Sequence, residues 1–237
     1  MTDIFYPKKE YLAGLTGMGG GPTGLPLKSA AGAASKIYSD EVFSLDFYRG
    51  TDANITINNG LDMTEGGLVL VKTRNTSYSL FFFDTERGVT KALTPSNGNT
   101  NDEVTEAKGV HTFSSNGWQI GGSGGDAAFN KSGNSYWTST FRTAEGFFDC
   151  IEYTGTGSDR EIAHNLKCAP SVMLIKGYDF DGEAWTLYHD TQGKDHYYIL
   201  NAAGTRDGHP SVWDNAAETR TEPTDEKFYL GTSHKVN

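Results

Sequence analysis

Two apolar runs decide the fold of this chain: Gly67-Leu-Val-Leu-Val-Lys72 and Tyr78-Ser-Leu-Phe-Phe-Phe83. Both have the length and the β-branched or aromatic content of buried strands, and Ile55-Thr-Ile57 before them alternates as a half-buried strand does. Successive side chains of a strand point to opposite faces of its sheet, so the three rings at 81–83 must occupy both faces. The second face then needs a cover, which predicts a contact between modules or between subunits at this strand.

The composition also favours an all-β protein. Glycine accounts for 29 of the 237 residues and aromatic residues for 12%, a combination that provides many turns and that disordered chains lack. Turn signals separate the strand-like runs at Arg49-Gly50, Asn58-Asn-Gly60, Glu65-Gly-Gly67 and Asn97-Gly98. The stretch from Thr100 to Lys108 permits a helix, but it is short and has no apolar stripe.

Charge and hydropathy exclude several classes of protein. The chain has 20 Lys and Arg against 30 Asp and Glu, and this net charge of −10 argues against nucleic-acid binding by phosphate neutralisation. No run approaches the ~18 apolar residues of a membrane-spanning helix, so we expect no membrane insertion. Residues 1–10 contain no apolar segment of a secretory signal. Cys150 and Cys168 could pair with each other, but two buried free thiols are favoured for a chain made in a reducing cytoplasm.

Residues 1–42 differ in composition from the rest and predict an extended, Gly-rich arm. The segments between residues 11 and 34 have no sustained period of 2 or 3.6, so they cannot bury a core of their own. Such a segment is either disordered or ordered against a partner. Because it carries scattered apolar side chains, we expect a docking arm that anchors the protein. The candidate partner-binding residues are Tyr11, Leu12, Leu15, Met18, Leu25 and Leu27.

An internal repeat divides the remaining chain. Residues 43–50 align with residues 148–155 at an offset of 105, with Phe, Tyr and Gly at matching positions. Other segments recur in the same order at offsets between 104 and 110: 57–61 with 162–166, 68–72 with 172–176, 84–85 with 190–191, and 117–121 with 227–231. The predicted fold is therefore all-β, with two tandem antiparallel β-sandwich-like modules at residues 43–146 and 147–237.

The repeat also predicts that the second module lacks its last strand. In the first module, Phe129-Asn130 precedes residues 131–142, which we interpret as a closing hairpin strand. In the second module, the equivalent Val236-Asn237 are the last residues of the sequence. We therefore expect the sequence to be part of a longer protein, since a finished protein rarely leaves such an edge exposed.

The second module carries an ordered series of motifs. They are Phe147-Phe148-Asp149, Tyr153-Thr154-Gly155, His164-Asn165-Leu166, Pro170, Lys176, Trp185 with Tyr188-His189, Tyr198 to Asn201, and Trp213. This series, within residues 147–231, resembles a repeat in virion structural and tail-fibre-like proteins of cyanobacterial and other marine tailed bacteriophages. The first module resembles the partner found just upstream in such proteins, through Gly66-Gly67-Leu68 and residues 84–88. Residues 11–17 resemble their leading arm more weakly.

The resemblance implies a structural protein of a tailed-phage virion, in the first place the virion-proximal part of a tail fibre or appendage involved in host attachment. It implies assembly in the host bacterial cytoplasm, other virion proteins of the tail, baseplate or capsid as partners, and a homo-oligomer with a trimer favoured. Distal modules would contact a host surface glycan. Two alternatives stay open: a capsid head fibre or decoration protein, and a carbohydrate-binding module that recognises host surface glycan.

The motifs of common enzymes lack their structural context, so we expect no catalytic residue, no cofactor and no metal site. Gly121-Gly-Ser-Gly-Gly125 matches a nucleophile elbow, but the five residues after it are too few for the helix that such an elbow needs. The glycines at 17–24 precede neither the Lys-Ser/Thr of a phosphate loop nor a βαβ unit. The six histidines have neither i, i+4 nor zinc-finger spacing, and packing is favoured for His164 and His189.

Two weaker candidates have a simpler structural explanation. The carboxylates Asp179, Asp181 and Glu183 could form a calcium loop, but the pattern lacks further EF-hand ligands, and a solvated acidic turn is favoured. Six aromatic residues are dense enough to line a sugar site, although strand aromatics are more often core or interface. They are Trp185, Tyr188, Tyr197, Tyr198, Trp213 and Tyr229.

Overall fold

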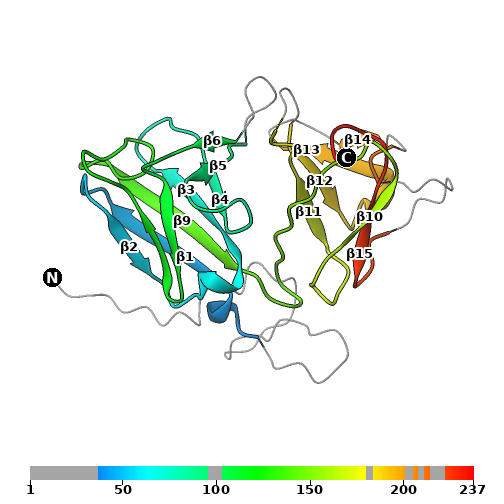
Figure 1. Cartoon of the computed structure of the whole chain (residues 1–237), viewed down its shortest axis with the longest axis horizontal. Coiled ribbons are helices and arrows are strands. Elements are labelled where there is room, and N and C mark those ends of the chain that lie inside the picture. The colour runs from blue at the N-terminus through cyan, green and yellow to red at the C-terminus, as the bar shows by residue number, and fades with distance from the viewer. Residues whose placement is uncertain (1–36, 96–102, 180–183, 201–204, 208–210, 214–221) are drawn as a thin grey trace.

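Antiparallel strands make up nearly all the regular structure of the chain, as Figure 1 shows. The computed structural model describes residues 37–95, 103–179, 184–200, 205–207, 211–213 and 222–237. The predicted all-β, sandwich-like fold is confirmed, while the predicted arm at 1–42 lies almost wholly outside the described residues. Among the described residues, no helix is long and apolar enough to cross a membrane.

The described residues between 37 and 146, which comprise the first module and the short segment before it, form nine strands and two one-turn 3-10 helices. They are η2 (Ser39–Glu41), β1 (Phe43–Arg49), β2 (Ile55–Asn58), η3 (Met63–Glu65), β3 (Gly67–Thr73), β4 (Phe81–Asp84), β5 (Lys91–Ala92), β6 (Val104–Thr105), β7 (Val110–Ser114), β8 (Gly117–Ile120) and β9 (Ser135–Arg142). One sheet has the order β1-β9-β3-β4 and the other β2-β8-β7, with a short β5-β6 pair beside them. The core includes the fully buried Trp118, Phe83 and Phe129.

Strand β9 is central, so the prediction that residues 131–142 form a closing hairpin strand is wrong. In the structure β9 lies between β1 and β3, and Tyr136 is in register with both Tyr48 and Thr73. The side chains on the two faces of β9 explain why this strand lies between β1 and β3. Tyr136 is buried in the module while its neighbour Trp137 points to the opposite face, and a strand that needs cover on both faces is typical of a sheet interior.

In the second module, the residues that the structure describes form six strands and one 3-10 helix. They are β10 (Arg160–Ala163), β11 (Val172–Ile175), β12 (Thr186–His189), η4 (Gly193–Asp195), β13 (His196–Ile199), β14 (Thr205–Asp207) and β15 (Lys227–Leu230). Its sheets have the orders β11-β12-β13-β14 and β10-β15. Its separate core includes Trp213, Tyr188 and Leu230. The pairs β2-β8 and β3-β4 of the first module thus recur as β10-β15 and β11-β12.

A tyrosine hydrogen bond also recurs at the sequence offset of 105 residues. The Tyr48 hydroxyl donates to the carbonyl of Phe129 at 2.5 Å, and the Tyr153 hydroxyl donates to the carbonyl of Val236 at 2.6 Å. Each bond connects the start of a module to a segment about 80 residues later. Both hydroxyls have a raised pKa, chiefly because burial disfavours the phenolate.

An asparagine connects the same segments in each module. In the first, the Asn130 side-chain oxygen accepts from the Thr51 amide at 2.9 Å, and its amide nitrogen donates to the carbonyl of Ala53. In the second, the Asn237 side-chain oxygen accepts from the Thr156 amide at 2.8 Å. Matching hydrogen bonds at matching positions show that the sequence repeat is a repeat of three-dimensional structure.

We expect Asn130→Ala to destabilise the first module by about 1–2 kcal/mol, because the fully buried Asn130 side chain loses its hydrogen bonds to the Thr51 amide and the Ala53 carbonyl. Urea unfolding followed by tryptophan fluorescence measures the change. Asn58→Ala, on an exposed position of β2, is the matched control and should change the free energy of unfolding by less than about 0.5 kcal/mol. Equal effects of the two substitutions would contradict this role of Asn130.

Candidate functional site

The two modules meet on the outer face of the four-stranded sheet of the first module. Phe81 and Phe83 lie in the core of that module, whereas Phe82 points outward and packs against Trp185 with ring centroids 4.8 Å apart. The Trp185 indole nitrogen donates to the carbonyl of Thr94 at 2.9 Å. The prediction that the ring triplet needs a cover is confirmed, and the cover is the second module.

A second aromatic contact joins the modules on the same outer face, at the strand β9. Phe141 on β9 lies 5.0 Å from the ring of Phe43 on the neighbouring β1. The segment leading into the second module then places Phe147 and Phe148 at 6.2 and 5.6 Å from Phe141. The outer face of the sheet therefore supports the second module both at β4 and at β9.

Between these contacts lies a cleft with a volume of about 610 Å³. One wall is the outer face of the first sheet, with Leu68, Leu70, Phe82 and Phe141. The opposite wall combines residues 147–155 with β11 and the residues after it. In Figure 1, β11 is the strand of the second module nearest to the first. We take this cleft as the candidate site, because it is large, mostly apolar and lined by both modules.

Asp84 and Arg87, which line the cleft, form an ion pair with each other and belong to a small charge network beside it. Arg87, whose side chain is only 5% exposed, contacts the Asp84 carboxylate at 2.5 Å. Glu103 binds Lys91 at 2.7 Å and lies 3.5 Å from Arg87. The Glu103 amide also donates to the carbonyl of Tyr178 at 3.0 Å, which connects the two modules by backbone.

Glu86 and Tyr178, which both line the cleft, have raised pKa values. Burial, with the nearby charges of Asp84, Asp149 and Glu152, raises the pKa of Glu86. The Tyr178 hydroxyl donates to the Glu152 carboxylate, and this hydrogen bond with burial raises the pKa of Tyr178 to about 12. Both shifts favour the neutral form of the group.

Cys150 lines the cleft, while Cys168 lies outside its lining. Both are free thiols in the structure, but each is half-buried, whereas the sequence favoured buried thiols. Burial raises the pKa of Cys150 well above the range of an ordinary thiol, and the neighbouring Asp84 and Glu86 add to the effect. Burial also raises the pKa of Cys168. A protonated thiol is a poor nucleophile, so neither cysteine has the environment of a reactive one.

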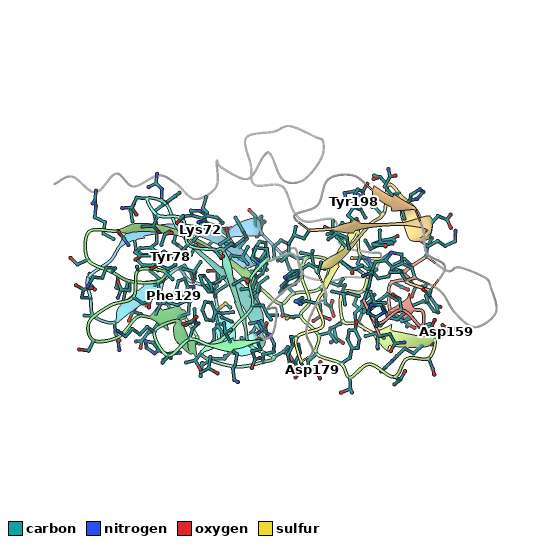
Figure 2. All side chains as sticks on the ribbon, turned by 90° about the horizontal axis from the view of Figure 1, so that it is seen from above. Lys72, Tyr78, Phe129, Asp159, Asp179 and Tyr198 are labelled. Carbon is teal, nitrogen blue, oxygen red and sulfur yellow. The ribbon has the colours of Figure 1, made fainter. Side chains whose placement is uncertain are left out.

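The structure places few of the predicted site residues at the cleft. Asp179 is exposed beside the boundary between the modules (Figure 2), whereas Asp181 and Glu183 lie outside the described residues. Tyr11, Leu12, Leu15, Met18, Leu25 and Leu27 also lie outside them. In the part of the chain that the structure describes, no group of three His, Cys, Asp or Glu could hold a metal ion.

The glycine motif and the histidines occupy structural positions. The motif at 121–125 follows β8 as a turn, closed by the Gly125 amide donating to the carbonyl of Gly122 at 3.1 Å. His164 is buried against the Phe228 ring, and its Nε2 lies 3.2 Å from the carbonyl of Thr224. His189, in contrast, lies 3.1 Å from the carboxylate of Asp190 on the surface.

Four of the six aromatic residues considered for sugar stacking are buried. Trp185 packs at the module interface, and Tyr188, Tyr197 and Trp213 belong to the second core. Trp213 and Tyr188 meet edge to face, with centroids 5.8 Å apart. Tyr198 and Tyr229 are half-buried. These rings therefore do not form one open platform for a pyranose.

An exposed apolar strip on β1 was missed in the sequence. Leu45 is 52% exposed and Phe47 is 61% exposed, on the same face of the sheet as Phe43. Phe47 is in register with Trp137 of β9 and lies under the guanidinium of Arg74. The alternation Phe43, Leu45, Phe47 was the available signal, but which face would be covered depends on the position of the second module.

Comparison with known proteins identifies a family to which the chain is similar. A family model described as a domain of unknown function, DUF7483, matches residues 38–237. The matched range includes both modules and the cleft between them. No curated protein and no solved structure matches the chain.

We expect Trp185→Ala to uncouple the modules. It removes the ring contact with Phe82 and the hydrogen bond to the Thr94 carbonyl, which should lower the free energy of unfolding by about 3 kcal/mol. Differential scanning calorimetry should show two separated transitions in place of the wild-type profile. Tyr229→Ala, a half-buried ring on β15 away from the interface, is the control and should keep the wild-type profile. An unchanged profile for Trp185→Ala would contradict the coupling.

We expect stability to fall with rising pH partly through Cys150. Its pKa is higher in the folded than in the unfolded chain, so the folded state retains a proton that the unfolded state releases above about pH 8.5. The stabilisation is present below that pH and is lost as the pH rises further. Urea unfolding at pH 7.5 and 9.5 should show a smaller loss for Cys150→Ser than for the wild type. Cys168→Ser, at a less buried thiol, should behave more like the wild type; the reverse order would contradict the assignment.

Proposed function

The chain belongs to the DUF7483 family, a domain family of unknown function, and for this member we propose a structural role. It is a component of a tailed-phage virion, in the first place the virion-proximal part of a tail fibre or appendage involved in host attachment. The resemblance of residues 147–231 to virion repeats supports this proposal. Other virion proteins and further copies of the chain are its partners.

The observation that carries the proposal is the exposed apolar strip of β1. β1 is the edge strand of its sheet, and an edge that presents Leu45 and Phe47 to solvent favours association. The strip continues the face on which the second module already packs through Phe141. We propose that a second copy of the chain covers it, as in a homo-oligomeric fibre.

The contact between the modules also suits a structural role. It combines the Phe82–Trp185 contact with the Glu103–Tyr178 backbone bond. Two modules joined by aromatic packing and backbone bonding resist relative rotation better than modules joined by a flexible linker. A stiff tandem unit is what a spacer in an appendage requires.

Gold-labelled antibody against this chain, applied to intact virions and imaged by electron microscopy, tests the proposal. We expect label at the tail or baseplate. Label over the head would instead assign the protein to capsid decoration, and unlabelled particles would overturn the virion role.

The role of the exposed strip can be tested with phage whose gene encodes the variant Leu45→Ser/Phe47→Ser in place of the wild-type protein. This variant should fold, as circular dichroism can check, yet be monomeric by light scattering and absent from the particles. Val89→Ser, at an exposed apolar position away from β1, is the control and should assemble normally. Normal assembly of the double variant would show that the exposed strip of β1 is not needed for association between copies of the chain.

A further inference from the structure

The cleft occupies the position that a strand fills in the first module. There, β9 lies between β1 and β3 and pairs with both. By the repeat, the counterparts of β1 and β3 are residues 148–154 and β11. No strand of the described residues lies between these two segments, and both line the cleft. The described part of the chain therefore contains the same slot twice, once occupied by β9 and once without a strand from the described residues.

The inner side of the open slot is the core of the second module. Met173 and Ile175 of β11 pack on this core from one side. Ile151 and Tyr153 pack on it from the other, and all four line the cleft. By the repeat they correspond to Val69, Val71, Asp46 and Tyr48, which in the first module are in register with the inward-facing residues 136, 138 and 140 of β9. An occupant with apolar side chains would complete this core.

The outer side of the slot is apolar as well. Leu68 and Leu70 of β3, with Phe82 and Phe141, form the opposite wall of the cleft. The occupant would be enclosed between the second core and the first sheet. It therefore needs apolar side chains on both faces, as β9 itself has with Tyr136 and Trp137 (burial on both faces is typical of interior strands).

The backbone of β11 is ready to pair. The carbonyl of Ser171 accepts from the Asp190 amide at 2.9 Å, so residues 171, 173 and 175 direct their backbone groups to β12. Val172 and Leu174 then direct theirs to the other side, which is the cleft. β11 is at the edge of its sheet, and the side chains of Val172 and Leu174 are 50% and 42% exposed.

We propose that the cleft is an acceptor groove for one extended β-strand donated by another polypeptide chain. The strand runs antiparallel to β11, as β9 runs antiparallel to β3, and pairs with Val172 and Leu174. A strand of about six to eight residues, at ~3.3 Å per residue, matches the length of β9. The proposal depends on the geometry of the repeat alone and stands whether or not the protein is part of a virion.

One position of the donated strand has a specific requirement. In the first module, the hydroxyl of Thr140 accepts from the Trp118 indole at 2.9 Å and from Asn59 at 3.1 Å. The second module has Phe228 and His164 at these places. Phe228 has no donor, and the His164 ring nitrogens already face the Thr224 carbonyl and the Leu166 amide. The groove therefore prefers an apolar residue at the position of Thr140.

A labelled peptide tests the proposal with the whole chain. The probe is a fluorescein-labelled peptide with the sequence of residues 131–142 and Thr140→Val, followed by fluorescence anisotropy. We expect saturable binding, severalfold tighter than for the unsubstituted sequence, and none for a scrambled sequence. Hydrogen exchange should slow at residues 148–154 and 172–176. The proposal would be overturned if hydrogen exchange slowed at β1 instead, or if neither the Thr140→Val peptide nor the unsubstituted peptide bound.

Two variants locate the bound peptide. Leu174→Pro removes a backbone donor at the sheet edge and should weaken binding about tenfold, whereas Leu174→Ala keeps that donor and should bind within about threefold of the wild type. If circular dichroism shows that the proline variant does not fold, Leu70→Asp on the opposite wall replaces it and should weaken binding by a similar factor. If a folded Leu174→Pro or Leu70→Asp variant bound the peptide with wild-type affinity, the peptide would not bind in this groove.

A filled groove provides the last control. The chain extended after Asn237 by the same peptide sequence can place the added strand in its own cleft, as residues after Asn130 do in the first module. The extended protein should no longer bind the free peptide. If it binds the peptide as tightly as the wild type does, the peptide lies elsewhere and the proposal is wrong.

Discussion

The apolar character of both faces of the β1-β9-β3-β4 sheet is the constraint on which the rest of the structure depends. The inner face buries Val69, Val71 and Phe83 against the β2-β8-β7 sheet. An exposed outer face with Leu70 and Phe82 would be unfavourable in water, and packing the second module there removes much of it. The second module covers this outer face at the module contact and covers it partly at the cleft. The exposed strip of β1 is the part of the same face that stays uncovered.

The two modules share their hydrogen-bonded framework and differ in one element. The tyrosine and asparagine bonds recur with nearly the same lengths, so the segments around the slot have the same support in both modules. Where the first module has β9, the second has a cleft of about 610 Å³. A sheet interior without its strand leaves apolar side chains and backbone groups without partners, which is why the difference bears on function.

Sequence patterns predicted the site only in part. The ring triplet at 81–83 predicted a covered outer face, because the period of two along a strand is a local property. The pairing of β9 was predicted wrongly, because its partners lie about 70 and 90 residues away and no local pattern specifies them. The repeat predicted that the second module lacks the strand equivalent to residues 131–142, but not that the place of this strand is a cleft between the modules, since that depends on their packing around Trp185.

By itself, the sequence determined the all-β class, the 105-residue repeat and the two-faced strand, since each follows from residue spacing or composition. Only the tertiary structure decided that β9 lies inside a sheet, that Phe82 meets Trp185, and that residues 148–154 and β11 enclose an open slot. The physical reason is that strand pairing and module packing join residues far apart in the chain. Their free energy depends on which surfaces meet in space, and local spacing does not encode that.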